Sequence, residues 1–240
     1  MKLCKLLMHN ILKGVYSMKK DEKKSAGDFS AWLGSTRNVL ITEEGAIVNC
    51  GDCNACCTSS YFIHIRPEEA STIAHINKKL LFPAPGLPKG NVLMGYDEYG
   101  RCPMLINQKC SIYPHRALTC RIYDCRVFAA AGVEPGGDDK SLIKKCTEQW
   151  VFTYPTQKDR DEHEAVKAAA QFIQNHADSF PHGAIPHNPS QLAILSIKVF
   201  KVFLKESKGS KKLSNNTEIA QAIINANEIF EARRLAAERR

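Results

Sequence analysis

The feature that most constrains this chain is a block of eight residues that contains four cysteines. The block reads Cys50-Gly51-Asp52-Cys53-Asn54-Ala55-Cys56-Cys57, with the last two thiols adjacent. A second cluster follows at Cys102, Cys110, Cys120 and Cys125. A buried structural cysteine packs as a small hydrophobic residue and needs no other thiol beside it. This density therefore indicates either metal ligation or disulfide cross-linking.

The size of the chain and its N-terminus favour metal ligation. With 240 residues, 44% of them hydrophobic, the chain can bury a core without cross-links, whereas disulfide-dense proteins are mostly small. Lys5, His9 and Asn10 interrupt the apolar residues at the start, so a secretory signal is not expected. The sequence contains no apolar run long enough for a transmembrane segment. We therefore expect a cytoplasmic, reducing environment, in which clustered thiols are more often metal ligands.

The charge distribution argues against an evenly basic nucleic-acid-binding domain. The net charge is +8, but residues 40–150 carry twelve basic and twelve acidic side chains. The excess positive charge lies in residues 1–39 and 197–215. A nucleic-acid partner is therefore not expected, although contacts of the basic flanks with nucleic acid or acidic lipid stay open as an alternative.

The patterns divide the chain into three regions. We expect a basic leader over residues 1–39, a cysteine-cluster metal-binding domain over 40–150 and a helical region over 151–240. The expected fold class is α+β, with a small irregular metal-stapled module of short strands and helices before a mainly helical C-terminal part. Cys4 and Cys146 lie apart from the two clusters and are left out of the predicted site. Translation could begin at Met1 or Met18, and residues 1–17 have the apolar spacing of a short amphipathic helix.

Turn residues and apolar patterns predict the elements of the cysteine region. They predict a hairpin over 40–48, a strand over 61–65, a helix over 66–80, an irregular segment over 82–88, paired strands at 91–96 and 101–106, a helix over 115–120, and a loop over 129–139.

Helical patterns dominate after Trp150. Helices are expected over 158–180, over 189–206 with Asn188 as the N-cap, and from about Thr217, with a linker at 208–212 between the last two. The apolar stripes of these helices are interpreted as core packing. A protein partner that binds the C-terminal helices is the alternative.

The spacing of the first cluster is suited to a metal centre. Cys50, Cys53 and Cys56 form a C-x2-C-x2-C run, which can present three thiolates to an iron–sulfur cluster or serve as a zinc knuckle. Gly51 and Asn54 tolerate the positive φ of a tight turn. The Cys57 thiol should diverge from that of Cys56, and so act either at a second centre or as a redox thiol. Eight thiolates would suit two four-cysteine sites, or one [4Fe–4S] cluster with spare cysteines.

Basic residues around the second cluster could offset thiolate charge. Arg101, Arg116, Arg121 and Arg126 could donate hydrogen bonds to sulfur. Ordinary surface ion pairs are the alternative interpretation of these arginines. His115 is a possible nitrogen ligand, although a structural histidine is the expected role.

The run CGDCNACC, followed by RCPMLINQKCSIYPHRALTCRIYDC, resembles the CxxCxxCC zinc- or iron-chelating family, often called YkgJ-like. The resemblance covers about residues 50–126, with Asn54 and Ala117 standing where that family usually has glycine and proline. It implies eight metal ligands, namely Cys50, Cys53, Cys56, Cys57, Cys102, Cys110, Cys120 and Cys125.

The resemblance also implies what could be bound. Members of that family are described as binders of an iron–sulfur cluster, iron or zinc (Zn2+), and a related cluster occurs in bacterial flagellin lysine methylases. We expect iron, held as an iron–sulfur cluster. The alternatives are a structural zinc module that supports a helical interaction domain, and an enzyme related to protein-lysine methylases. The glycine-rich segment 132–137 lacks the preceding strand that a nucleotide- or phosphate-binding loop requires. No catalytic residue is predicted.

Overall fold

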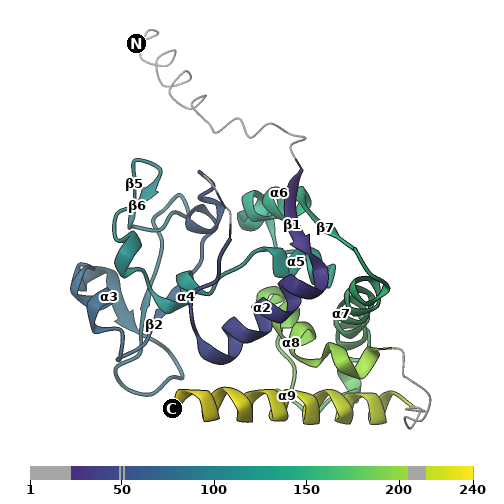
Figure 1. Ribbon diagram of the computed structural model, residues 1–240. Helices are drawn as coiled ribbons and strands as arrows, with labels where there is room; N and C mark the ends of the chain where they lie inside the picture. Colours follow the sequence, from purple (N-terminus) through teal and green to yellow (C-terminus); the bar gives the residue numbers. More distant parts are fainter. Residues whose placement is uncertain (1–22, 49, 51, 205–214, 240) are drawn as a thin grey trace, which may run out of the picture.

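Two parts of unequal size make up the structure, a larger helical body and a smaller lobe (Figure 1). The lobe carries Cys102, Cys110 and Cys120 of the second cluster. The structure is a computed structural model, and it describes residues 23–48, 50, 52–204 and 215–239. The amphipathic helix expected over 1–17, Cys4 and the linker expected at 208–212 lie outside the described residues. The described fold mixes helices with short strands, which confirms the α+β prediction.

The body is built from helices that pack on one another around a continuous apolar core. Phe29, Phe128, Val166, Ile197 and Ile223 are almost completely buried there. The helices are α2 (Phe29–Thr42), α5 (Arg126–Ala131), α6 (Ser141–Gln149), α7 (Gln157–Asn175), α8 (Pro189–Val199) and α9 (Asn216–Glu238).

A parallel strand pair ties the beginning of the described chain to the middle of the sequence. Strand β1 (Lys24–Asp28) pairs with β7 (Trp150–Thr153), with Lys24 opposite Trp150 and a register shift between Ser25 and Gly27. Residues 24–42 therefore pack on the helices that follow Trp150.

The smaller lobe is a set of short strands and helices. Its three-stranded antiparallel sheet has the order β2-β4-β3, with Ile63 opposite Met94. A hairpin, two short helices and a small apolar core complete the lobe. The elements are β2 (Ile63–Ile65), β3 (Leu81–Pro83), β4 (Val92–Met94), β5 (Leu105–Ile106), β6 (Lys109–Cys110), α3 (Ala70–Ala74) and α4 (Leu118–Arg121).

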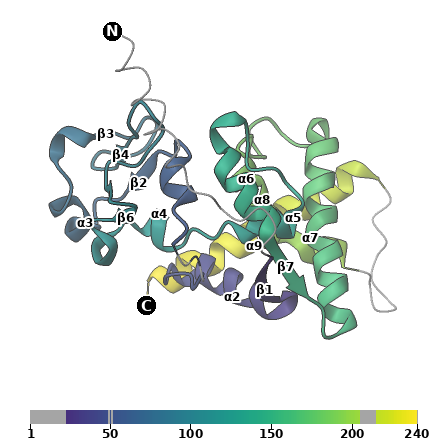
Figure 2. The same ribbon diagram turned by 90° about the horizontal axis from the view of Figure 1, so that it is seen from above.

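Helix α9 runs beneath α2, and its C-terminal end lies on the lobe side of the molecule (Figures 1 and 2). Ile223 and Phe230 are buried on the inner face of α9. This confirms that the apolar stripe of the last helix is core packing. Within the described ranges, none of the helices is long and apolar enough to cross a membrane.

The Asn188 helix cap was predicted correctly, whereas the expected hairpin over 40–48 is wrong. The Asn188 side chain accepts hydrogen bonds from the backbone N–H groups of Ser190 and Gln191, and Asn215 caps α9 in the same way. Helix α2 continues to Thr42 and ends at Glu43, whose φ of 57° is left-handed. The predicted turn at Gly45 is therefore replaced by a helix end two residues earlier.

The strand pairing in the lobe also differs from the prediction. Strand β4 pairs with β2 and β3, and β5 pairs with β6, so segments 91–96 and 101–106 are not one hairpin. The expected helix over 66–80 is reduced to α3 and a 3-10 turn, and β3 occupies part of the segment expected to be irregular.

Candidate metal centre

The first cysteine block folds as a turn followed by a short 3-10 helix. The backbone N–H of Cys53 donates to the carbonyl of Cys50 (3.0 Å), and that of Cys57 donates to the carbonyl of Asn54 (2.8 Å). The 3-10 helix spans Ala55–Thr58. Asn54 has a φ of −124°, so the left-handed conformation predicted for it is not used. Local hydrogen bonds thus gather the four thiols of the block within two turns of chain.

All nine cysteines of the described residues are free thiols. They divide into two groups according to the core against which they pack. Cys53, Cys125 and Cys146 pack with the core of the body, and Cys102, Cys110 and Cys120 pack against the core of the lobe. The remaining three, Cys50, Cys56 and Cys57, belong to the first block. Burial and the nearby thiols of Cys53 and Cys56 raise the pKa of Cys50, and the thiols of Cys57 and Cys53 raise the pKa of Cys56.

The body group consists of Cys50, Cys53, Cys125 and Cys146. Helix α6 packs on the 3-10 helix Ala55–Thr58 and brings the Cys146 Sγ to 3.4 Å from the Cys53 Sγ. One proton shared between these sulfurs lowers the pKa of Cys53 and raises that of Cys146. Burial, followed by the nearby thiols of Cys53 and Cys56, raises the pKa of Cys50 to about 11.

Cys125 completes this group and has a hydrogen-bond donor of its own. The indole Nε1–H of Trp150 donates to the Cys125 Sγ at 3.3 Å. Burial nevertheless raises the Cys125 pKa to about 12, and the thiols of Cys50 and Cys53 raise it further. The four members of the group therefore influence one another electrostatically.

The lobe group consists of Cys56, Cys57, Cys102, Cys110 and Cys120. The backbone N–H of Cys102 donates to the Cys57 carbonyl at 2.7 Å, which joins the first block to the second cluster. Burial raises the Cys120 pKa to about 12, with further contributions from Cys56, Cys102 and Cys110. The β5–β6 hairpin presents Cys110 opposite Leu105.

Cys56 and Cys57 do not behave as independent thiols. A hydrogen bond to the Cys57 thiol is the main cause of the raised Cys56 pKa, and Cys53 of the body group also contributes. Cys56 is the member of the first block that is electrostatically coupled to both groups.

The arginines expected to neutralise sulfur mostly bind other groups. Arg126 pairs with Asp124 at 2.8 Å and donates to the carbonyls of Ala26 and Ile47. Arg116 stacks on the Tyr113 ring at 4.0 Å, although its charge also lowers the Cys120 pKa. The sulfur donor in the body group is Trp150, a residue that sequence reasoning did not single out.

His115, considered as a nitrogen ligand, lies in a separate cluster of the lobe. Its ring stacks on that of His75 with centroids 3.7 Å apart, and its Nδ1 is 2.9 Å from the Ser71 hydroxyl. Among the residues that the structure describes, no group of three or more His, Cys, Asp or Glu side chains is arranged to hold a metal ion.

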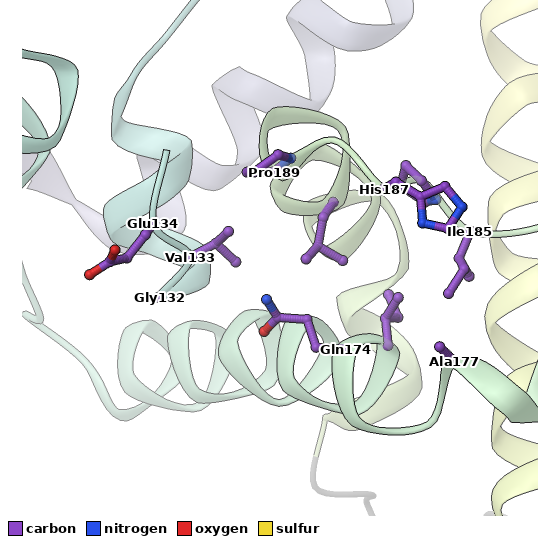
Figure 3. A pocket seen from close by; sticks show the side chains of 11 residues that line it. Gly132, Val133, Glu134, Gln174, Ala177, Ile185, His187 and Pro189 are labelled. Atoms are coloured by element: carbon purple, nitrogen blue, oxygen red, sulfur yellow. The ribbon is translucent and has the colours of Figure 1, made fainter. Parts of the chain in front are cut away.

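A pocket of about 420 Å³ lies apart from the thiols, next to the end of α5 (Figure 3). Val133, Ile173 and Leu192 form apolar parts of its lining. Gly132 ends α5 with a φ of 66°, and its N–H bonds the Phe128 carbonyl. The glycine-rich segment follows a helix, so it does not have the strand–loop–helix arrangement of a phosphate-binding loop.

The free cysteines of this region are suited to coordinate a metal as thiolates. Zinc and iron–sulfur centres both use cysteine thiolates, and N–H donors to sulfur tune such centres. Free, part-buried thiols gathered from two clusters, with an indole donor to one sulfur, are the features of a cysteine-rich metal-binding module.

Residues 49–149 match the family model CxxCxxCC, described as "Putative zinc- or iron-chelating domain". The match covers less than half of the chain, and it supports metal binding by this segment. It spans the eight predicted ligands and Cys146. Searches of curated proteins and of solved structures returned no match.

Proposed function

We propose that the chain chelates iron, as an iron–sulfur cluster, through its clustered cysteines. The observation that carries this proposal is that the nine described cysteines are free and that six of them pack in two sets of three, one against each core. The proposed ligands are the eight cysteines of the family pattern. A reducing compartment such as the cytoplasm would keep these thiols available.

The surroundings of the body group support a redox centre. Cys53 and Cys125 pack against a hydrophobic core, and the Trp150 N–H faces the Cys125 sulfur. Hydrogen bonds to sulfur and exclusion of solvent are two means by which proteins set the potential of iron–sulfur clusters. An iron–sulfur cluster bound here would supply electron transfer, and the chain would set its potential.

Zinc in a structural role is the second candidate, and the small core of the lobe favours it. Only six buried residues form that core, namely Ile63, Ile65, Ile76, Met94, Ile112 and Ala117. A core of this size is marginal without a cross-link or a metal. A zinc ion held by the lobe group would supply that stabilisation.

Anaerobic purification with absorption spectroscopy and metal analysis tests the proposal. Broad absorbance near about 400 nm, together with iron and acid-labile sulfide, is expected for an iron–sulfur cluster. Colourless protein with stoichiometric zinc and no iron would instead establish the structural candidate. Protein that takes up neither metal under reducing conditions would refute both.

Single-cysteine variants test whether the thiols are the ligands. Cys53→Ser and Cys120→Ser should each lower both the metal content and the melting temperature, because metal binding is coupled to folding. Cys4→Ser is the matched control, since Cys4 lies outside the predicted set, and it should retain the metal. Equal metal content in all three variants would contradict the assignment.

A further inference from the structure

Cys146 lies outside the eight-cysteine pattern, and its sequence position gives it no role. We propose that Cys146 is a metal ligand and that it binds the same metal atom as Cys53. This inference rests on the proposed function, because it concerns the same thiols. It adds a ninth thiol and assigns it to the body group.

The distance between the two sulfurs carries the inference. The Sγ atoms are 3.4 Å apart, much farther than the roughly 2.05 Å of a disulfide bond. Two thiolates on one tetrahedral metal ion, each about 2.3 Å from it, lie about 3.8 Å from each other. The two sulfurs would therefore need to move only slightly farther apart to bind one ion between them.

This spacing also narrows the kind of centre that the body group can hold. Each iron of a [4Fe–4S] cube takes a single thiolate, so the protein sulfurs are kept apart by the cube. Two thiolates meet on one metal in a four-thiolate zinc site and on each iron of a [2Fe–2S] cluster. The Cys53–Cys146 pair matches these last two arrangements.

Helix α6 is placed to deliver this ligand. Cys146 is 3% exposed and its helix packs against the 3-10 helix that follows Cys53. Four residues later, Trp150 ends α6 and donates its indole N–H to Cys125. One end of α6 thus supplies a thiol at position 146 and a sulfur hydrogen-bond donor at position 150 to the same group.

With Cys146 included, the thiols can supply two separate four-cysteine sites. The body group has four members, Cys50, Cys53, Cys125 and Cys146. The lobe group has five, of which Cys56 and Cys57 are adjacent in the sequence. One of the five thiols is therefore in excess of a four-cysteine site.

The test compares the full-length chain with its Cys146→Ser variant, both purified anaerobically. Metal per chain is measured as isolated and again after loading with Co2+, whose thiolate charge-transfer absorbance reports the sulfur ligands. The variant should lose the metal of one site or bind it at least about tenfold more weakly. Cys53→Ser should give the same loss, and the double variant should lose no more than either single variant.

Two controls separate ligation from damage to the fold. Ile143→Val alters a buried residue on the same helix and should leave the metal content and the cobalt spectrum unchanged. Cys102→Ser should remove metal from the lobe group, so its loss should add to that of Cys146→Ser. Unchanged metal content, affinity and cobalt spectrum in Cys146→Ser would overturn the inference while leaving the proposed function intact. Absence of metal in the wild-type chain would overturn the proposed function first.

A measurement on the wild-type chain covers the case in which Cys146→Ser fails to fold. In the protein loaded with 113Cd, a metal–proton correlation from the Cys146 β-protons to a cadmium that is also correlated with Cys53 is expected. Cadmium correlated with Cys53 but not with Cys146 would overturn the inference. A Cys53–Cys146 disulfide in the anaerobically isolated protein, with no metal in the body group, would also overturn it.

Discussion

At Cys125 the sulfur receives a hydrogen bond from an aromatic side chain instead of the expected arginine. The indole of Trp150 donates to it at 3.3 Å, while the neighbouring Arg126 is held by Asp124. A second indole, that of Trp32, donates to the Asp124 carboxylate at 2.9 Å. Two tryptophans far apart in the sequence thus donate hydrogen bonds to the consecutive residues Asp124 and Cys125.

Trp150→Phe should weaken metal binding without emptying the core. Phenylalanine keeps most of the packing but removes the N–H that the sulfur accepts. Loss of such an outer hydrogen bond typically costs about 10- to 100-fold in metal affinity, and competition with a chelator measures it. Trp32→Phe is the matched control, because it removes an indole bonded to a carboxylate and not to sulfur. Equal affinity losses in the two variants would contradict a specific role for the Trp150 donor.

The sequence indicates the eight cysteines proposed as ligands but neither Cys146 nor Trp150. The eight cysteines stand out because their spacing is unusual in a chain of this size. Cys146 is a single thiol in an amphipathic helix, and nothing local separates it from a core residue. Its proximity to Cys53 arises from the packing of α6, across 93 positions of sequence.

Among the elements, those with local signals were predicted best. Asn188 caps a helix whose beginning is set by its own side chain, as its sequence predicts. The strands of the lobe are two or three residues long, so their pairing depends on distant partners and not on alternation. The turn expected at Gly45 predicts a hairpin over 40–48, whereas α2, which packs on α9, continues to Thr42.

The contact between α7 and α2 contains a buried histidine whose protonation should affect the stability of the fold. The His163 ring stacks on Phe29 with centroids 4.2 Å apart, and its Nδ1 is 2.7 Å from the Tyr154 hydroxyl. Burial lowers the His163 pKa to about 4, and the charge of Lys167 acts in the same direction. The folded protein therefore keeps this ring neutral at pH values where an unfolded histidine is protonated.

This histidine should make the body less stable in acid. As the pH falls from about 6.5 to 4, the unfolded chain gains a proton that the folded protein does not, so the free energy of unfolding decreases by about 3 kcal/mol. Above pH 6.5 the contribution is constant. Denaturant unfolding of wild type and His163→Phe across this range measures the effect, and the variant should show a flatter profile. Acid release of metal acts on both proteins, so only their difference is diagnostic, and parallel profiles would refute the role of His163.

For the molecule as a whole, the two hydrophobic cores differ in size. The core cluster of the body contains many buried apolar residues, whereas that of the lobe contains six, with Cys102, Cys110 and Cys120 packed around them. An ion-pair chain also connects the parts, since Glu43 after α2 binds Arg66 after β2 at 2.6 Å and lies 3.6 Å from Arg234 of α9. Partly exposed ion pairs contribute little to stability. A metal bound by the thiols would therefore hold the lobe together more effectively than these ion pairs.

Removal of the metal should therefore affect the two parts differently. Hydrogen exchange of the anaerobic chain, before and after treatment with a chelator, should show a large loss of protection in β2, β4 and α4 of the lobe. Helices α7, α8 and the central part of α9 should lose less protection, because many buried apolar residues hold the body core together besides the body group of thiols. Cys120→Ser should reproduce the lobe effect without a chelator, and Cys4→Ser should not. Uniform loss of protection across both parts would mean that the metal stabilises one cooperative unit, and no loss in the lobe would mean that its small core suffices.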